Sequence, residues 1–85
     1  MAKGPSDKAK HVIALIKNCG DLAVIHRRIT EARDVFRAAR MLCSEFGFDI
    51  PEEMLDSIDY AILEKPPQAL AETLMVFMND IKKLS

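Results

Sequence analysis

Hydrophobic residues in the middle of the chain recur at alternating steps of three and four positions. The row consists of Leu22, Ile25, Ile29, Ala32, Phe36, Ala39, Cys43 and Phe46. This spacing is typical of one apolar stripe along an α-helix, and it continues over about three heptads. Asp21 precedes the row as a candidate N-cap, and Gly47 follows it where a left-handed glycine ends many helices. The pattern therefore predicts a long second helix over residues 22–46.

A helix over residues 22–46 would be longer than the body it belongs to. It would measure about 37 Å, whereas a globule of this size is roughly 30 Å across. Either the helix breaks near Thr30, where Thr-Glu restarts it, or it stays whole and its overhang packs on a second chain. The unbroken register through Ile29 and Ala32 favours the second arrangement. We therefore expect a homodimer built on the second helix, with Phe36 at its seam.

Shorter apolar patterns predict helices at residues 7–19, 50–64 and 67–84. Ser6 or Asp7 can cap the first of these helices, and Gly20 is placed to end it. Asp49 and Glu52 have the spacing of a capping box for the next one. Together with the long second helix, these segments predict an all-α fold, a small helical bundle of about four helices.

Length and composition indicate one soluble domain. The 85 residues are 49% hydrophobic and 29% charged, which suits a globular core and is atypical of disorder. We expect a single domain over residues 1–85, with a flexible tail at residues 1–5. No apolar run approaches the length of a membrane span, and no secretory signal is visible. The expectation is a cytoplasmic protein with no membrane partner.

The residues that most often bind metals are few and poorly spaced for that purpose. Cys19 and Cys43 fall at apolar helical positions, so two reduced core thiols are favoured over a disulfide. Neither cysteine forms a zinc-binding spacing with the other or with His11 or His26. We expect no metal site and no cofactor.

Acidic side chains on the third helix offer the strongest candidate for catalysis. Glu52, Asp56 and Asp59 share one face, which could hold a cation or supply a general acid and base. A solvated or salt-bridged face is the favoured interpretation, because no nucleophile or histidine accompanies the three carboxylates at a recognisable spacing. The chain also lacks a glycine-rich phosphate loop and a nucleophile elbow. We therefore expect a protein without enzymatic activity.

Methionines recur on the predicted helices. They are Met41, Met54, Met75 and Met78. Their flexible thioethers would suit an adaptable binding surface, but at helical spacing core filling is favoured.

Charge is distributed unevenly along the chain. Residues 1–42 carry nine Lys or Arg and four Asp or Glu, a net charge of +5, whereas residues 43–85 carry three and nine, a net charge of −6. An arginine stripe, consisting of Arg33, Arg37 and Arg40, follows one edge of the second helix. Arg27 and Arg28 add charge on other faces of that helix. No acidic residue stands four positions from any arginine of the stripe, so the stripe needs counter-ions from elsewhere.

Three sources could neutralise these arginines. The favoured source is internal, namely the carboxylates of the third helix. The others are an acidic protein surface and nucleic-acid phosphate. The candidate binding residues are Arg27, Arg28, Arg33, Arg37 and Arg40. The leading hypothesis is a non-enzymatic protein–protein interaction module, such as a regulator, adaptor or inhibitor. The alternative is a nucleic-acid-binding regulator that uses the arginine stripe.

Overall fold

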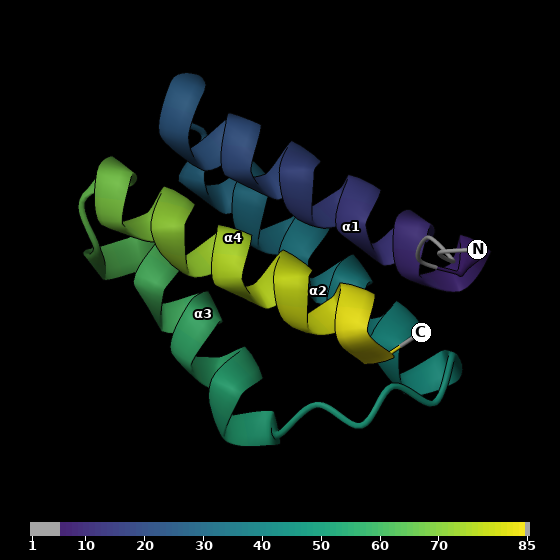
Figure 1. Ribbon diagram of the computed structural model, residues 1–85. Helices are drawn as coiled ribbons and strands as arrows, with labels where there is room; N and C mark the ends of the chain where they lie inside the picture. The colour runs from purple at the N-terminus through teal and green to yellow at the C-terminus, as the bar shows by residue number, and fades with distance from the viewer. Residues whose placement is uncertain (1–5, 85) are drawn as a thin grey trace.

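A computed structural model of the protein describes residues 6–84, and in this range it contains four α-helices, one short π-helix and no strand (Figure 1). The elements are α1 (Asp7–Gly20), η1 (Asp21–Ile25), α2 (Ile29–Glu45), α3 (Glu52–Glu64) and α4 (Pro67–Leu84). The predicted all-α bundle is thus confirmed. The flexible tail expected at residues 1–5 lies outside the described residues. No helix in the described range has the length and apolar character that crossing a membrane requires.

One apolar core joins the four helices. α1 and α2 form the most closely packed pair, α4 packs on α1, and α3 contacts both α2 and α4 (Figure 1). Ala32 and Ala39 are fully buried on α2, and their small side chains let α1 approach closely. Phe36 of α2 meets Phe77 of α4 edge to face, with ring centroids 6.2 Å apart. Both rings are at most 1% exposed, so they form the centre of the core.

The predicted continuous helix over residues 22–46 is wrong. The predicted left-handed end at Gly20 does not form. Gly20 has helical dihedral angles, and α1 passes there directly into the π turn of η1. The chain then reverses at residues 26–28, where Arg27 adopts a left-handed φ of 58°. The Arg28 amide closes this corner by donating to the Leu22 carbonyl at 2.8 Å. The alternative prediction, a break of the helix near Thr30, is close to the observed start of α2 at Ile29.

The break has a tertiary cause. The steps of three and four continue across it because both segments contribute to the same core, so the pattern alone cannot reveal the reversal. Folding back allows α1 to cover the apolar stripe of α2 within one chain. As a result α2 has 17 residues and α4 has 18, so the second helix is not the long element of the fold.

The proposed seam at Phe36 is also wrong. Phe36 is 0% exposed and is enclosed by the protein's own core. A second chain could reach it only if the bundle opened.

The end of α2 follows the sequence closely. Gly47 adopts a left-handed φ of 73°. Its amide donates to the Ser44 carbonyl at 3.2 Å, and the Phe48 amide donates to the Cys43 carbonyl at 2.9 Å. These two bonds form a Schellman motif, which satisfies carbonyls that the helix leaves unpaired. The predicted termination at Gly47 is confirmed.

The two predicted helix starts have different outcomes. The Ser6 hydroxyl accepts a hydrogen bond from the Ala9 amide at 3.2 Å, so Ser6 is the N-cap of α1. The capping box at Asp49 does not form, because α3 begins only at Glu52, after Pro51, with no side-chain cap. The fixed φ of proline already directs the chain into the helix, so Asp49 lies too far upstream.

Candidate functional site

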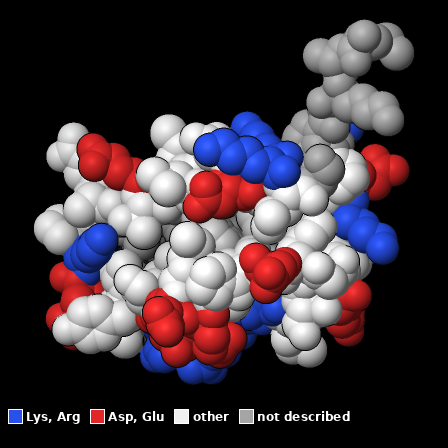
Figure 2. All heavy atoms as spheres, turned by 60° about the horizontal axis from the view of Figure 1, so that its bottom comes forward, with Lys and Arg blue, Asp and Glu red and all other residues white. Residues whose placement is uncertain are grey.

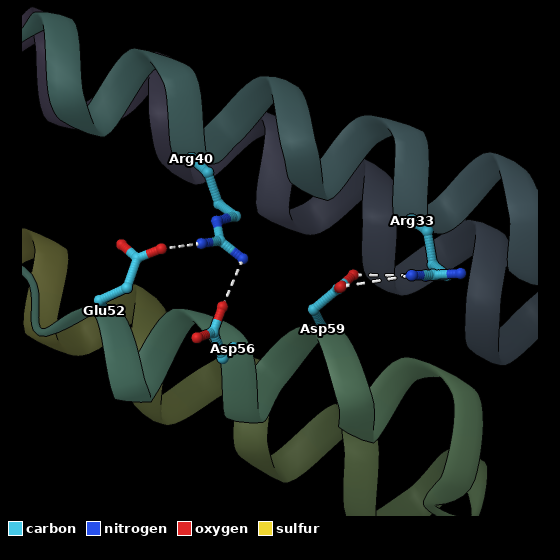
Figure 3. A network of polar contacts seen from close by, with 5 residues as sticks. All are labelled: Arg33, Arg40, Glu52, Asp56 and Asp59. Carbon is cyan, nitrogen blue, oxygen red and sulfur yellow. Dashed lines mark hydrogen bonds and ion pairs between the residues drawn. The ribbon is translucent and has the colours of Figure 1, made fainter.

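Two members of the arginine stripe reach across to the acidic face of α3 (Figure 3). Arg33 donates to both carboxylate oxygens of Asp59, each at 3.4 Å. Arg40 donates to Asp56 at 3.1 Å through Nη1 and to Glu52 through Nη2. The favoured internal source of counter-ions is therefore confirmed for these two arginines.

These ion pairs position α3 more than they stabilise the fold. The side chains of Arg33 and Arg40 are 30% and 23% exposed, whereas Glu52 and Asp56 are 72% and 65% exposed. Exposed ion pairs contribute about 0.2–1 kcal/mol each, because water screens them and both side chains lose freedom. The planar guanidinium nevertheless sets a definite direction for its partner. The network thus sets how α3 lies along α2.

The other three candidate arginines lie apart from this network. Arg37 meets only Asp34, at 3.7 Å, and both side chains are more than half exposed. Arg28, rather than Arg27, pairs with Glu31, at 3.0 Å. Within the described residues no ion pair involves Arg27, which occupies the left-handed corner. The structure therefore does not bring the five arginines together into one patch.

The thiols are buried and poorly suited to reaction. Cys19 and Cys43 are free thiols, 0% and 2% exposed. Burial and, to a smaller extent, the negative charge of Asp59 raise the pKa of Cys19 to about 11. Burial also raises the pKa of Cys43. Because the thiolate is the nucleophile, these shifts suppress reactivity at neutral pH. In the described part of the chain, no three His, Cys, Asp or Glu side chains cluster in a way that could hold a metal ion.

An apolar groove that the sequence did not indicate lies between α1, η1 and α4. We call it the α1–α4 groove; it encloses about 300 Å³ and opens to solvent. The residues that shape it include Gly20, Val24, Ile25, Leu74, Met75 and Met78. A Cβ at Gly20 would make an ordinary van der Waals contact with Leu74 Cδ1, at 3.4 Å. Lys17 and Asp21 supply the charged groups on its border.

Two large apolar side chains of this groove are exposed. Ile25 is 67% exposed and Met75 is 59% exposed. Ile25 belonged to the predicted buried row, but the i→i+5 bonds of the π turn change the direction of the residues that follow. Single π turns are frequent at functional sites. The interruption of the helix thus creates the exposed apolar side of the groove.

The methionines divide between core and surface. Met54 and Met78 pack partly buried against the core, as core filling predicts. Met41 and Met75 are more than half exposed. Met75 and Met78 both line the α1–α4 groove, where unbranched thioethers can adapt to the shape of a ligand.

The described residues therefore offer apolar grooves and a set of separated arginines as candidate surfaces. No protein-family model, curated protein or solved structure matches this chain.

Proposed function

We propose that this protein is a small, non-enzymatic, cytoplasmic interaction module that binds a partner protein in the α1–α4 groove. A regulator, adaptor or inhibitor would act in this way. The observation that carries the proposal is that Ile25 and Met75 are both exposed and line the same apolar groove. Fully burying a side chain of this size contributes about 1.5–3 kcal/mol, so a partner that covered both would gain substantially.

The shape of the groove favours helical or extended apolar segments. It is open to solvent and is lined mostly by apolar residues of α1, η1 and α4, with Lys17 and Asp21 among them, and a groove of this kind can take the apolar face of an amphipathic helix. The flexible Met75 and Met78 side chains would adjust to the residues that enter. Exposed apolar patches of this kind mark interaction sites on small proteins.

The experiment starts by identifying the partner. A photo-reactive amino acid in place of Lys17, on the border of the groove, would crosslink the bound protein in cells for identification by mass spectrometry. Binding of the purified partner would then be measured by calorimetry for Ile25→Ser and Met75→Ser. Each substitution is expected to weaken binding about tenfold, the equivalent of roughly 1.4 kcal/mol.

The matched control is Met41→Ser. Met41 is 66% exposed on α2, away from the groove, so it removes a similar apolar side chain at another place. The affinity of the Met41→Ser variant for the partner should stay within twofold of the affinity of the unaltered protein. Equal losses for all three variants would contradict the α1–α4 groove as the site.

Nucleic-acid binding is the second candidate function. The observation in its favour is that Arg27, Arg28 and Arg37 have exposed or locally paired side chains, with no α3 carboxylate bound to them. Anisotropy of labelled duplex DNA and RNA at two salt concentrations would test it. Binding that falls steeply with salt and disappears in the Arg27/Arg28/Arg37→Ala variant would support phosphate recognition. No binding at low salt would dismiss it.

A further inference from the structure

A second apolar groove is lined by residues of α3 and α4. Figure 1 shows α3 and α1 on opposite sides of α4. This α3–α4 groove consists of two hollows of about 270 and 260 Å³, which share Met54 and Asp80 and so run into each other. Its floor is formed by the buried side chains of Ile58 and Phe77, and Val76 is 60% exposed along it. Figure 2 shows a largely uncharged surface with both acidic and basic groups along its borders.

The dimensions of the groove suit a helix. Its lining extends along α4 from Thr73 to Leu84, which corresponds to about 16 Å, or three helical turns. Three turns of an amphipathic helix would present two or three apolar side chains to the two hollows.

The charge on the groove selects among such helices. Asp80 lines both hollows and is half-buried, and no ion pair engages it within the described residues. Asp49 lines the far end and forms no ion pair in the described range. Lys83 is the cation that lines this end. The groove therefore has an excess of negative charge.

A helix that covered the groove would remove water from Asp80. Burying a carboxylate is costly unless a hydrogen-bonded cation compensates for the lost hydration. An occupant without a cation at this point would leave Asp80 unpaired, whereas one with Lys or Arg would form a charge-assisted hydrogen bond.

We propose that the α3–α4 groove binds a cationic amphipathic helix of a partner protein, with a Lys or Arg of that helix paired to Asp80. The inference concerns a surface separate from the α1–α4 groove and does not depend on the function proposed for that groove. Occupation of both grooves would place two segments on opposite sides of α4, as in an adaptor.

The test uses a defined probe. A fluorescein-labelled peptide of about 14 residues, built from leucine and lysine at helical spacing, would be about 20 Å long when bound as a helix. A peptide with glutamate in place of lysine is the matched control. Anisotropy against the full protein should show saturable binding of the lysine peptide and none of the glutamate peptide.

Protein variants locate the site. Asp80→Asn should weaken binding of the lysine peptide about fivefold to tenfold, since it removes a charge-assisted contact. Glu45→Gln makes the same change in charge outside the groove and should change affinity by less than twofold. Val76→Ser should weaken binding, whereas Ile25→Ser in the α1–α4 groove should not.

Several outcomes would overturn the proposal. Equal effects of Asp80→Asn and Glu45→Gln would show unspecific charge attraction, and loss with Ile25→Ser alone would assign the peptide to the α1–α4 groove. Binding of the glutamate peptide would exclude selection by Asp80. A dimer in light scattering that Val76→Ser dissociates would identify the occupant as a second copy of this chain. Because Ile25→Ser changes only the α1–α4 groove, it distinguishes a failure of the α3–α4 groove proposal from a failure of the function proposed for the α1–α4 groove.

Discussion

α2 contacts its neighbours through apolar side chains, and on the side of α3 it adds ion pairs to that apolar packing. Toward α1 and α4, α2 presents Ala32, Phe36 and Ala39, all 0% exposed. Toward α3 it presents Arg33 and Arg40, which reach partly exposed carboxylates. Burial stabilises the fold in proportion to the apolar area removed from water and depends little on direction. Ion pairs near water contribute little free energy, but they fix how one helix is oriented against the other. α3 also buries Leu55, Ile58, Ala61 and Ile62 in the common core, but its contacts with the neighbouring helices are the least extensive, so we infer that α3 detaches most readily.

The largest effect is expected on the apolar side. Phe36→Ala removes a fully buried ring that contacts Phe77 and should lower the free energy of unfolding by about 3–5 kcal/mol, measured by urea denaturation. Met41→Ala, at an exposed position of the same helix, is the control and should change it by less than about 0.5 kcal/mol. A loss below about 1 kcal/mol for Phe36→Ala would break the distinction between the two sides.

The second largest effect is expected at alkaline pH, which should lower the free energy of unfolding through the Cys19 thiol in the apolar core. The pKa of Cys19 is raised from 9.0 to about 11 in the folded protein, so the unfolded chain loses this proton first as pH rises. The stabilisation is complete below pH 9 and is lost between pH 9 and 11. The total is about 2–3 kcal/mol, since one pKa unit corresponds to 1.36 kcal/mol.

Denaturation of the unaltered protein and of Cys19→Ala between pH 7 and pH 11 measures this effect. The difference in unfolding free energy between the two should decrease above pH 9 in favour of the variant. A constant difference would mean that the thiol ionises as easily in the folded protein as in the unfolded chain.

A smaller loss is expected on the charged side. Arg40→Met keeps most of the apolar stem but removes the contacts with Glu52 and Asp56, so we expect a loss of about 1 kcal/mol that decreases with added salt. Hydrogen exchange should accelerate in α3 before it does so in α1. Arg37→Met, whose pair with Asp34 is long and exposed, should change stability by less than about 0.3 kcal/mol. Equal losses of stability in Arg40→Met and Arg37→Met would show that the contacts of Arg40 with α3 contribute no more than the exposed pair of Arg37.

Effects of similar or smaller size are expected at the corners at the two ends of α2. Arg27→Gly should raise the free energy of unfolding by about 0.5 kcal/mol, because relief of a left-handed conformation worth about 1–2 kcal/mol exceeds the entropic cost of glycine. Gly47→Ala should lower it by about 1 kcal/mol, although a Cβ there meets no atom within 4 Å. Thermal unfolding measures both, and a loss in Arg27→Gly would show that the arginine side chain stabilises the corner.

The candidate site could be predicted only in part. The chemical need of Arg33 and Arg40 for carboxylates was readable from their spacing, and the acidic face of α3 was readable in the same way. Which arginines would meet that face was not, because it depends on the packing angle of two helices. The α1–α4 groove had no signal in the sequence, since Ile25 matched the buried row and only the π turn exposes it.

The sequence by itself determined the helical class, the span of α4, and the end of α2 at Gly47, because helical periodicity, proline and glycine act through local backbone preferences. Tertiary structure alone decided that the apolar row would break. A left-handed Arg27 costs energy locally and has no favourable local signal, so the reversal is stable only because it lets α1 bury the stripe of α2. Burial over a whole helix outweighs strain at one residue, and that balance cannot be read from the spacing of residues along the chain.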